Sequence, residues 1–177
     1  MKTVFLKRVA IVIIAVVTMS VSAAAQKQGD MAVGANLVLG SGNSYSNMGV
    51  GAKFQYNVID PLRLEGSFTY FFEKDLVSMW DLSVNAHYLF PIAEQITVYP
   101  LAGLGILGSK ANIPSFDFGG LGSYGGGSHS DTEFGFNLGG GIDFKVTENV
   151  ILNVELKYKI GDNWNRLLIS AGVAYKF

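Results

Sequence analysis

Apolar and polar side chains alternate along most of the chain, and the alternation is clearest in residues 167–177. Every second residue from Leu167 to Phe177 is apolar there, and the residues between them are mostly small or polar. Because successive side chains of a strand point to opposite faces, this pattern predicts a β-strand with one wholly apolar face. A tilted strand of about 9–11 residues crosses a bilayer, so this stretch has the length of a membrane-spanning strand.

The same two-residue period fits seven earlier stretches. Together with the last one, the predicted strands are residues 31–39, 48–58, 62–72, 80–90, 96–106, 134–146, 150–160 and 167–177. No position on their apolar faces carries a charge, an amide, an imidazole or a Ser or Thr hydroxyl. In the fifth strand Pro100 cannot donate to a ladder, so we expect a bulge or a late strand start there.

The opposite faces of these strands carry charged and amide side chains interspersed with glycines. A barrel dissolved in water would place its apolar side chains inside, whereas polar-inside, apolar-outside is the arrangement of a barrel in lipid. The sequence therefore predicts an all-β fold, an eight-stranded antiparallel up-and-down transmembrane β-barrel over residues 26–177. We expect the inward charges to form a polar network that fills the lumen, with Lys53, Arg63, Glu65, Asp143, Glu155 and Lys157 as members.

Charges inside a narrow barrel are tolerated only when they are paired and hydrogen-bonded. If the second and third strands pair around residues 59–60, Lys53 lies opposite Glu65 and Gln55 lies opposite Arg63. Charges of both signs are present on the inward faces, so we expect them to pair across the lumen and close it. We interpret them as structural filling rather than as a path for a substrate.

The connections between the predicted strands alternate between long and short, as the external loops and periplasmic turns of such barrels do. With the N-terminus in the periplasm, the external connections are residues 41–47, 73–78, 109–131 and 161–165. Aromatic residues gather at both predicted rims, as they do at membrane interfaces. The Gly- and Ser-rich loop 109–131 is the candidate contact for an extracellular partner, through Phe116, Phe118 and Tyr124.

The first 25 residues differ from the rest of the chain. Three basic residues precede an apolar run, and Ala23 to Ala25 offer a small-residue cleavage site, which predicts a signal peptide over residues 1–25 and secretion to the outer membrane. The remaining chain has more acidic than basic residues and no basic patch, so nucleic acid is not an expected partner. The absence of cysteine excludes disulfides, cysteine metal sites and an acylated cysteine anchor.

The chain resembles the small eight-stranded outer-membrane β-barrel proteins of the OmpA-transmembrane-domain, OmpX and OmpW type, which are porin-like β-barrel domains. The resemblance rests on the strand pattern, on the Pro-Leu-Ala-Gly-Leu-Gly run at residues 100–105 and on the terminal Phe177. It implies that the barrel-assembly machinery reads Val173, Tyr175 and Phe177 as an assembly signal. We expect no peptidoglycan-binding domain after the barrel, so the cell-wall tether of full-length OmpA proteins is not carried over.

Three motifs resemble sites for dinucleotide binding, hydrolysis or metal binding, but each lacks the neighbouring residues or structure that such a site needs. Residues 103–108 match GxGxxG, but no helix follows to hold a pyrophosphate, so no dinucleotide cofactor is expected. His87, Asp81 and Ser83 share one strand face, and residues 129–131 read His-Ser-Asp in a loop, but neither set shows a base held against a nucleophile. Acidic and amide residues in the loops lack EF-hand spacing, and we therefore expect no catalytic residue and no metal.

Three functions fit the pattern. In the first, the barrel is a membrane anchor for external loops that serve surface interaction, adhesion or envelope integrity, because an eight-stranded barrel leaves no room inside beyond its own side chains. In the second, it is a narrow pore or a lateral transporter of small solutes, because inward glycines such as Gly103 and Gly105 leave space in the wall. The third, an outer-membrane lipid hydrolase, rests on fold analogy alone.

Overall fold

The computed structural model describes residues 27–42, 45–74, 77–117, 123–161 and 165–177. The predicted signal peptide, residues 1–25, lies outside this part of the chain. No helix long and apolar enough to cross a membrane occurs in the described part. The described residues form nine strands: β1 (Met31–Gly42), β2 (Tyr45–Ile59), β3 (Leu62–Lys74), β4 (Val77–Tyr88), β5 (Phe90–Ala93), β6 (Ile96–Asp117), β7 (Ser123–Lys145), β8 (Val150–Gly161) and β9 (Arg166–Lys176).

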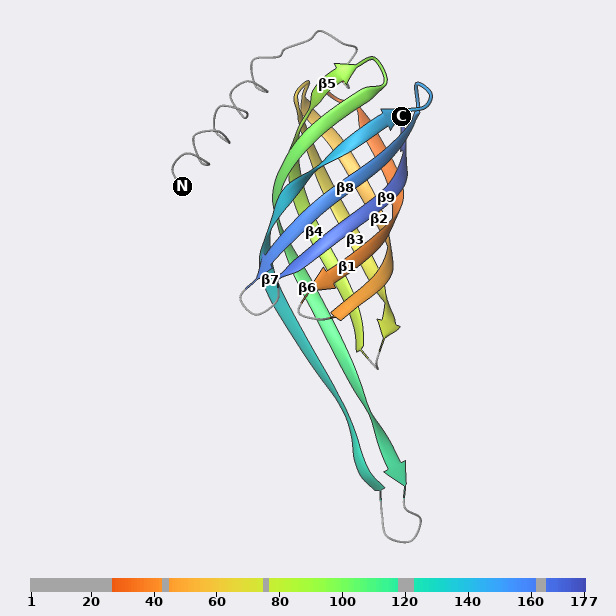
Figure 1. Cartoon of the computed structure of the whole chain (residues 1–177), viewed down its shortest axis with the longest axis vertical. Coiled ribbons are helices and arrows are strands. Elements are labelled where there is room, and N and C mark those ends of the chain that lie inside the picture. Colours follow the sequence, from red (N-terminus) through yellow and green to blue (C-terminus); the bar gives the residue numbers. More distant parts are fainter. Residues whose placement is uncertain (1–26, 43–44, 75–76, 118–122, 162–164) are drawn as a thin grey trace, which may run out of the picture.

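These strands close into one antiparallel barrel (Figure 1). Neighbours in sequence pair with each other except for β4 and β5; β4 instead pairs with β6, and β1 pairs with β9. The short β5 pairs only with β6 among the described strands, at the end of the barrel that carries the C-terminus (Figure 1). The wall therefore has eight strands with β5 as an addition, which confirms the predicted fold class.

Burial of the side chains alternates with the predicted two-residue period. Outward apolar side chains are exposed and inward polar ones are buried, which is the reverse of a protein dissolved in water. In β8, Leu152, Val154 and Leu156 point outward and are 47%, 48% and 51% exposed. The side chains between them, among them Asn153 and Glu155, point inward and are buried. This arrangement stabilises the barrel in lipid, where apolar side chains meet acyl chains and every backbone group is satisfied within the closed sheet.

The prediction that residues 109–131 form a loop is wrong for most of that segment. Strands β6 and β7 continue past the barrel rim, and their register runs without a shift from Ile96 opposite Phe144 to Asp117 opposite Ser123. Glycine has low strand propensity, but here the ladder is already aligned by the barrel, so each further pair adds to an existing hairpin. The result is a long two-stranded hairpin that projects from the end opposite the C-terminus (Figure 1).

The predicted irregularity at Pro100 takes a different form. β6 begins at Ile96, and Pro100 pairs with Gly140 of β7 in an unbroken register, so there is neither a late start nor a bulge on that side. On the other side, pairing with β4 ends at Leu101 and pairing with β5 begins at Val98. Pro100 therefore lies where the neighbouring strand is interrupted, a position that does not require an N–H donor.

The register expected for the second and third strands is also wrong, by two residues. Gln55 lies opposite Glu65, and Lys53 lies opposite Ser67. The shift arises because the turn is centred on Asp60 and Pro61, with a register irregularity between Asn57 and Ile59. A shift of two residues leaves every side chain on its predicted face, so the lumen keeps its predicted composition.

Candidate functional site

Arg63 of β3 is the centre of the buried network near the end that carries the C-terminus. Its side chain is fully buried, and its Nη1 donates to Asp143 Oδ2 of β7 at 2.6 Å. Its Nε and Nη2 face Nδ1 of His87 at 3.3 and 3.0 Å. The guanidinium also lies over the ring of Tyr99, with 4.7 Å to the centroid, and that ring stacks on His87 at 4.6 Å. One arginine thus connects four strands across the lumen.

Two carboxylates lie beside this centre, each with its own partners. Glu65 accepts a hydrogen bond from Gln55 Nε2 at 2.7 Å, and Lys53 Nζ lies 3.6 Å from it. Lys53 and Glu65 are therefore in contact along a diagonal of the sheet, although they do not lie opposite each other. Glu155 accepts from the Tyr99 hydroxyl at 3.2 Å and lies 3.9 Å from Lys157 Nζ. All six residues expected in the lumen network thus face the interior.

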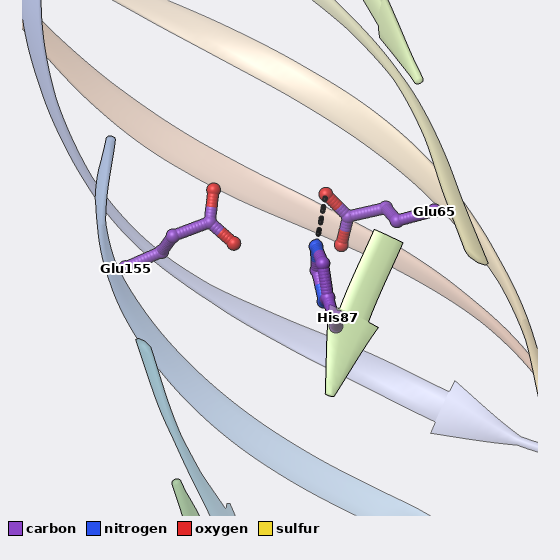
Figure 2. Close-up of side chains that lie close together, drawn as sticks. All are labelled: Glu65, His87 and Glu155. Carbon is purple, nitrogen blue, oxygen red and sulfur yellow. Dashed lines mark ion pairs between the residues drawn. The ribbon is translucent and has the colours of Figure 1, made fainter. Parts of the chain in front are cut away.

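Glu65, His87 and Glu155 form the group among the described residues whose ligand atoms could converge on a metal ion, within 4.8 Å of one another. Figure 2 shows the His87 imidazole directed at Glu65, with Glu155 on the other side. Arginine only donates hydrogen bonds, so Nδ1 of His87 must accept from Arg63 and its Nε2 must carry the proton. A protonated Nε2 is a donor to carboxylates rather than a metal ligand, and metal-bound histidines instead donate from the other nitrogen. The cluster therefore fits a neutralised hydrogen-bond network better than a metal site.

A second buried layer lies nearer the hairpin end. Lys159 forms an ion pair with Asp81, and the Ser83 hydroxyl donates to Asp81 Oδ1 at 2.6 Å. Asn137 Nδ2 contacts Ser83 Oγ at 3.1 Å and donates to Asn85 Oδ1 at 2.9 Å. The Ser83 hydroxyl is thus directed at an acid, while His87 is held by Arg63. The candidate hydrolase set is not assembled as a nucleophile and base.

An apolar layer closes the lumen at the base of the hairpin, and the sequence pattern missed it. Val38, Phe71, Met79 and Leu168 are buried and packed together. Arg166, which lies one residue before the predicted strand, is buried over the Phe71 ring at 4.7 Å and donates to Met79 Sδ at 3.3 Å. In the sequence this layer was visible as apolar residues at inward-facing positions near the strand ends.

The inward glycines do not leave open space. A methyl group on Gly141 would lie 2.5 Å from the Tyr99 hydroxyl oxygen, and one on Gly103 would collide with Asn85. These two glycines therefore make room for a side chain of the neighbouring strand, and a methyl group on Gly139 would meet the backbone of β8 instead. This finding removes the observation on which the pore hypothesis rested.

A cavity of about 230 Å³ opens at the end of the barrel that carries the C-terminus. Its lining is charged and includes Asp30, Lys145, Lys176 and Asp143. Lys176 Nζ lies 3.3 Å from Asp30 Oδ2 at its edge. Because Asp143 is bonded to Arg63, the cavity meets the central network there. It is a vestibule of the filled lumen.

Comparison with known proteins agrees with this geometry. Residues 11–177 match the family described as outer membrane protein beta-barrel domain. The chain belongs to this family. No protein with a curated description matches it. As an outer-membrane β-barrel, the protein places its apolar wall in the lipid bilayer.

Solved structures of other outer-membrane barrels share the fold. Ail, the attachment invasion locus protein of Yersinia pestis, is 22% identical, with a TM-score of 0.58 over 85% of this chain and 99% of Ail. Neisserial surface protein A is also 22% identical, with a TM-score of 0.59 over 84% of this chain and 96% of its own. The N-terminal β-barrel domain of Pseudomonas aeruginosa OprF is 19% identical, with a TM-score of 0.58 over 86% of this chain and 100% of the domain.

The three residues of the predicted assembly signal lie on the outside of this outer-membrane barrel. Val173, Tyr175 and Phe177 are exposed on one face, and the Phe177 N–H donates to the Met31 carbonyl at 3.0 Å. Phe116 and Tyr124 lie opposite each other in the projecting hairpin, so they belong to strands rather than to a loop. Phe118 falls outside the described residues. By the usual orientation of such barrels, short turns face the periplasm and the long hairpin faces outward.

Proposed function

We propose that the protein is an outer-membrane anchor that presents the β6–β7 hairpin to the cell's surroundings for surface interaction. The observation that carries this proposal is the combination of a filled lumen with a hairpin that extends beyond the barrel rim (Figure 1). A barrel whose interior is closed by Arg63 and by the apolar layer at Phe71 has its main functional surface on its external segments. We propose no catalytic activity.

The related fold of Ail supports an adhesive role without fixing its ligand. Ail is named as an attachment invasion locus protein, and one of its structures is a complex with the heparin analogue sucrose octasulfate. The base of the present hairpin carries the acidic residues Asp131 and Glu133, which would repel a sulfated ligand. We therefore extend the idea of attachment to this chain, and not the polyanionic ligand.

The test is a shortened hairpin on an intact barrel. Replacing residues 112–128 by Asn-Gly joins Ala111 to His129, which are paired in the hairpin, through a favoured two-residue turn. Cells that carry this variant should lose attachment to host-cell or matrix surfaces while keeping normal outer-membrane levels of folded barrel. Serine at Phe116, Phe118 and Tyr124 in the full hairpin tests the aromatic contacts separately. Undiminished attachment of the shortened variant would contradict the proposal.

We also propose that Val173, Tyr175 and Phe177 are recognised by the barrel-assembly machinery. All three are exposed on the outer face beside β1, where a factor approaching from the membrane reaches them. Deleting Phe177 should lower the outer-membrane level in cells but leave refolding of purified protein into detergent unchanged. An equal loss in both assays would show that Phe177 acts on barrel stability instead.

A further inference from the structure

The two edges of the projecting hairpin are unequal. Pairing of β4 with β6 continues to Ala111, so the outer edge of β6 is free only over residues 112–117. Pairing of β8 with β7 begins at Gly135, so no described strand covers the edge of β7 over residues 123–134. At about 3.3 Å per residue, this free edge of β7 is about 40 Å long. It is roughly twice the free length of β6.

The direction of the backbone groups on β7 follows from two hydrogen bonds at its far end. The Lys145 N–H donates to Gln95 on the β6 side at 2.8 Å, and the Val146 N–H donates to Val150 on the β8 side at 2.9 Å. Successive residues of a strand direct their backbone groups to opposite neighbours, and the β6–β7 register has no shift. Even-numbered residues from 124 to 134 therefore direct both N–H and C=O to the free edge.

The β6 edge carries protection against pairing that the β7 edge lacks. Pro114 is even-numbered, so by the same rule its nitrogen faces the free edge of β6 and offers no N–H. Lys110 is exposed next to that edge. Proline and lysine are residues that natural sheets use to block edge pairing. Residues 123–134 contain neither of these nor arginine, so the edge of β7 lacks both of the blocks that the β6 edge carries.

The side chains beside this edge favour a basic occupant. Asp131 and Glu133 lie on one face, and with Met79, Leu107 and Ser109 they line a small hollow at the mouth of the barrel. Glu133 Oε1 is buried without a hydrogen-bond partner among the described residues. No lysine or arginine in residues 123–134 offsets the two carboxylates.

We propose that the free edge of β7 is a strand-addition site for an extended segment of a partner protein that carries Lys or Arg on alternate residues. Backbone hydrogen bonds to the even-numbered residues provide affinity, and the carboxylates of Asp131 and Glu133 select basic side chains. The proposal rests on the surface-interaction function and names the class of partner for it. A second copy in the same membrane fits less well. Its β7 would run parallel and place like charges side by side.

Purified full-length protein in lipid nanodiscs provides the binding test. The probe is a synthetic peptide of alternating Lys and Val, with an alternating Glu and Val peptide as its control. We expect the basic peptide to bind and the acidic one not to bind. Amide exchange should slow at Ser128, Ser130 and Thr132, while His129 and Asp131, already bonded to β6, change little. Equal binding of both peptides, or protection confined to β6, would overturn the proposal.

Substitutions at the edge separate backbone pairing from charge. The double variant Ser130→Pro/Thr132→Pro removes two N–H groups that face the free edge and none that bond to β6, so the hairpin should persist and peptide binding should fall at least tenfold. Ser130→Val/Thr132→Val keeps both N–H groups and should bind normally. Asp131→Asn/Glu133→Gln should also weaken binding at least tenfold, whereas Lys110→Gln should not. This charge pair remains informative if the proline variant fails to fold.

The same variants distinguish this inference from the function on which it rests. If the shortened hairpin abolishes attachment of cells but the proline and charge variants attach normally, the hairpin functions without strand addition and the inference is wrong. If the shortened hairpin attaches normally, the proposed function itself is wrong. Association of the protein with itself in nanodiscs, lost in the proline variant, would show that a second copy is the occupant and would also overturn the inference.

Discussion

Removing the Arg63 side chain should destabilise the barrel strongly, because it leaves a buried carboxylate without its partner. In Arg63→Ala, the Asp143 carboxylate loses its 2.6 Å partner, and its other oxygen, Oδ1, is buried without a partner among the described residues. The Arg63 side chain and the Asp143 side chain are 1% and 5% exposed, so the intact pair is shielded from solvent. Breaking a buried ion pair from one side costs about 3–5 kcal/mol.

The matched control is the ion pair of a basic side chain with an aspartate at the edge of the vestibule. Lys176 and Asp30 are 3.3 Å apart, but their side chains are 27% and 25% exposed. Such a partly exposed pair contributes about 0–1 kcal/mol, so Lys176→Ala should have little effect. Both variants remove a long basic side chain, but only Arg63→Ala leaves a buried carboxylate without its partner. The difference between their unfolding free energies therefore measures the cost of the unpaired carboxylate.

Reversible urea unfolding in lipid vesicles, followed by the gel shift of the folded barrel, measures both variants. A double-mutant cycle of Arg63→Ala, Asp143→Asn and the double variant measures the interaction energy between the two side chains. We expect a coupling energy of about 2 kcal/mol or more, in the upper part of the range for residues in contact. Additivity within about 0.5 kcal/mol, or a cost for Arg63→Ala no larger than that for Lys176→Ala, would refute the assignment of Arg63 as the centre of the lumen network.

Three further predictions follow from the wall and the lumen. Gly141→Ala should cost about 1–3 kcal/mol by overpacking against Tyr99, whereas Gly66→Ala, whose added methyl meets nothing within 4 Å, should not; equal unfolding free energies would contradict the filled lumen. Val154→Arg, in the middle of β8, should cost about 2–4 kcal/mol in vesicles, and Val146→Arg, near the rim, about 0–1; the reverse order would mean that the membrane boundary is misplaced. In planar bilayers the purified monomer should show at most rare, small openings, because Arg63 and Phe71 block the lumen; stable ohmic channels would instead favour transport.

The barrel could be predicted from the sequence because lipid imposes a simple rule on every strand. Any charge on the outward face of a strand such as β8 would meet acyl chains, so the two-residue period is strict where it contacts the membrane. The faces were therefore correct even where the register was not, as for Lys53 and Glu65. The pairing register depends on where the chain turns. The turn lies at Asp60 and Pro61, one residue later than predicted, which changes the register but leaves each side chain on its predicted face.

The hairpin and the apolar layer could not be read from the same rule. Outside the membrane no lipid enforces alternation, so residues 109–131 look like a loop, although the backbone of residues 109–117 and 123–131 continues the ladder. Inside the barrel, Phe71 and Met79 occupy positions that the pattern assigns to polar residues, because a closed end can be filled by either kind of side chain. The contact of Arg63 with Asp143 joins residues 80 positions apart, which no local pattern indicates.

The unbroken register of β6 and β7 has a mechanical consequence. A partner that pulls on the tip of the hairpin pulls along the strands, while the hydrogen bonds of an antiparallel ladder lie across them. Both arms of the hairpin are pulled together, so the force passes to β4 and β8 as shear on the β4–β6 and β7–β8 ladders, where many bonds share it at once. Force that separated β6 from β7 sideways would instead break the bonds one at a time. The hairpin should therefore resist tension along the membrane normal and yield to peeling across it.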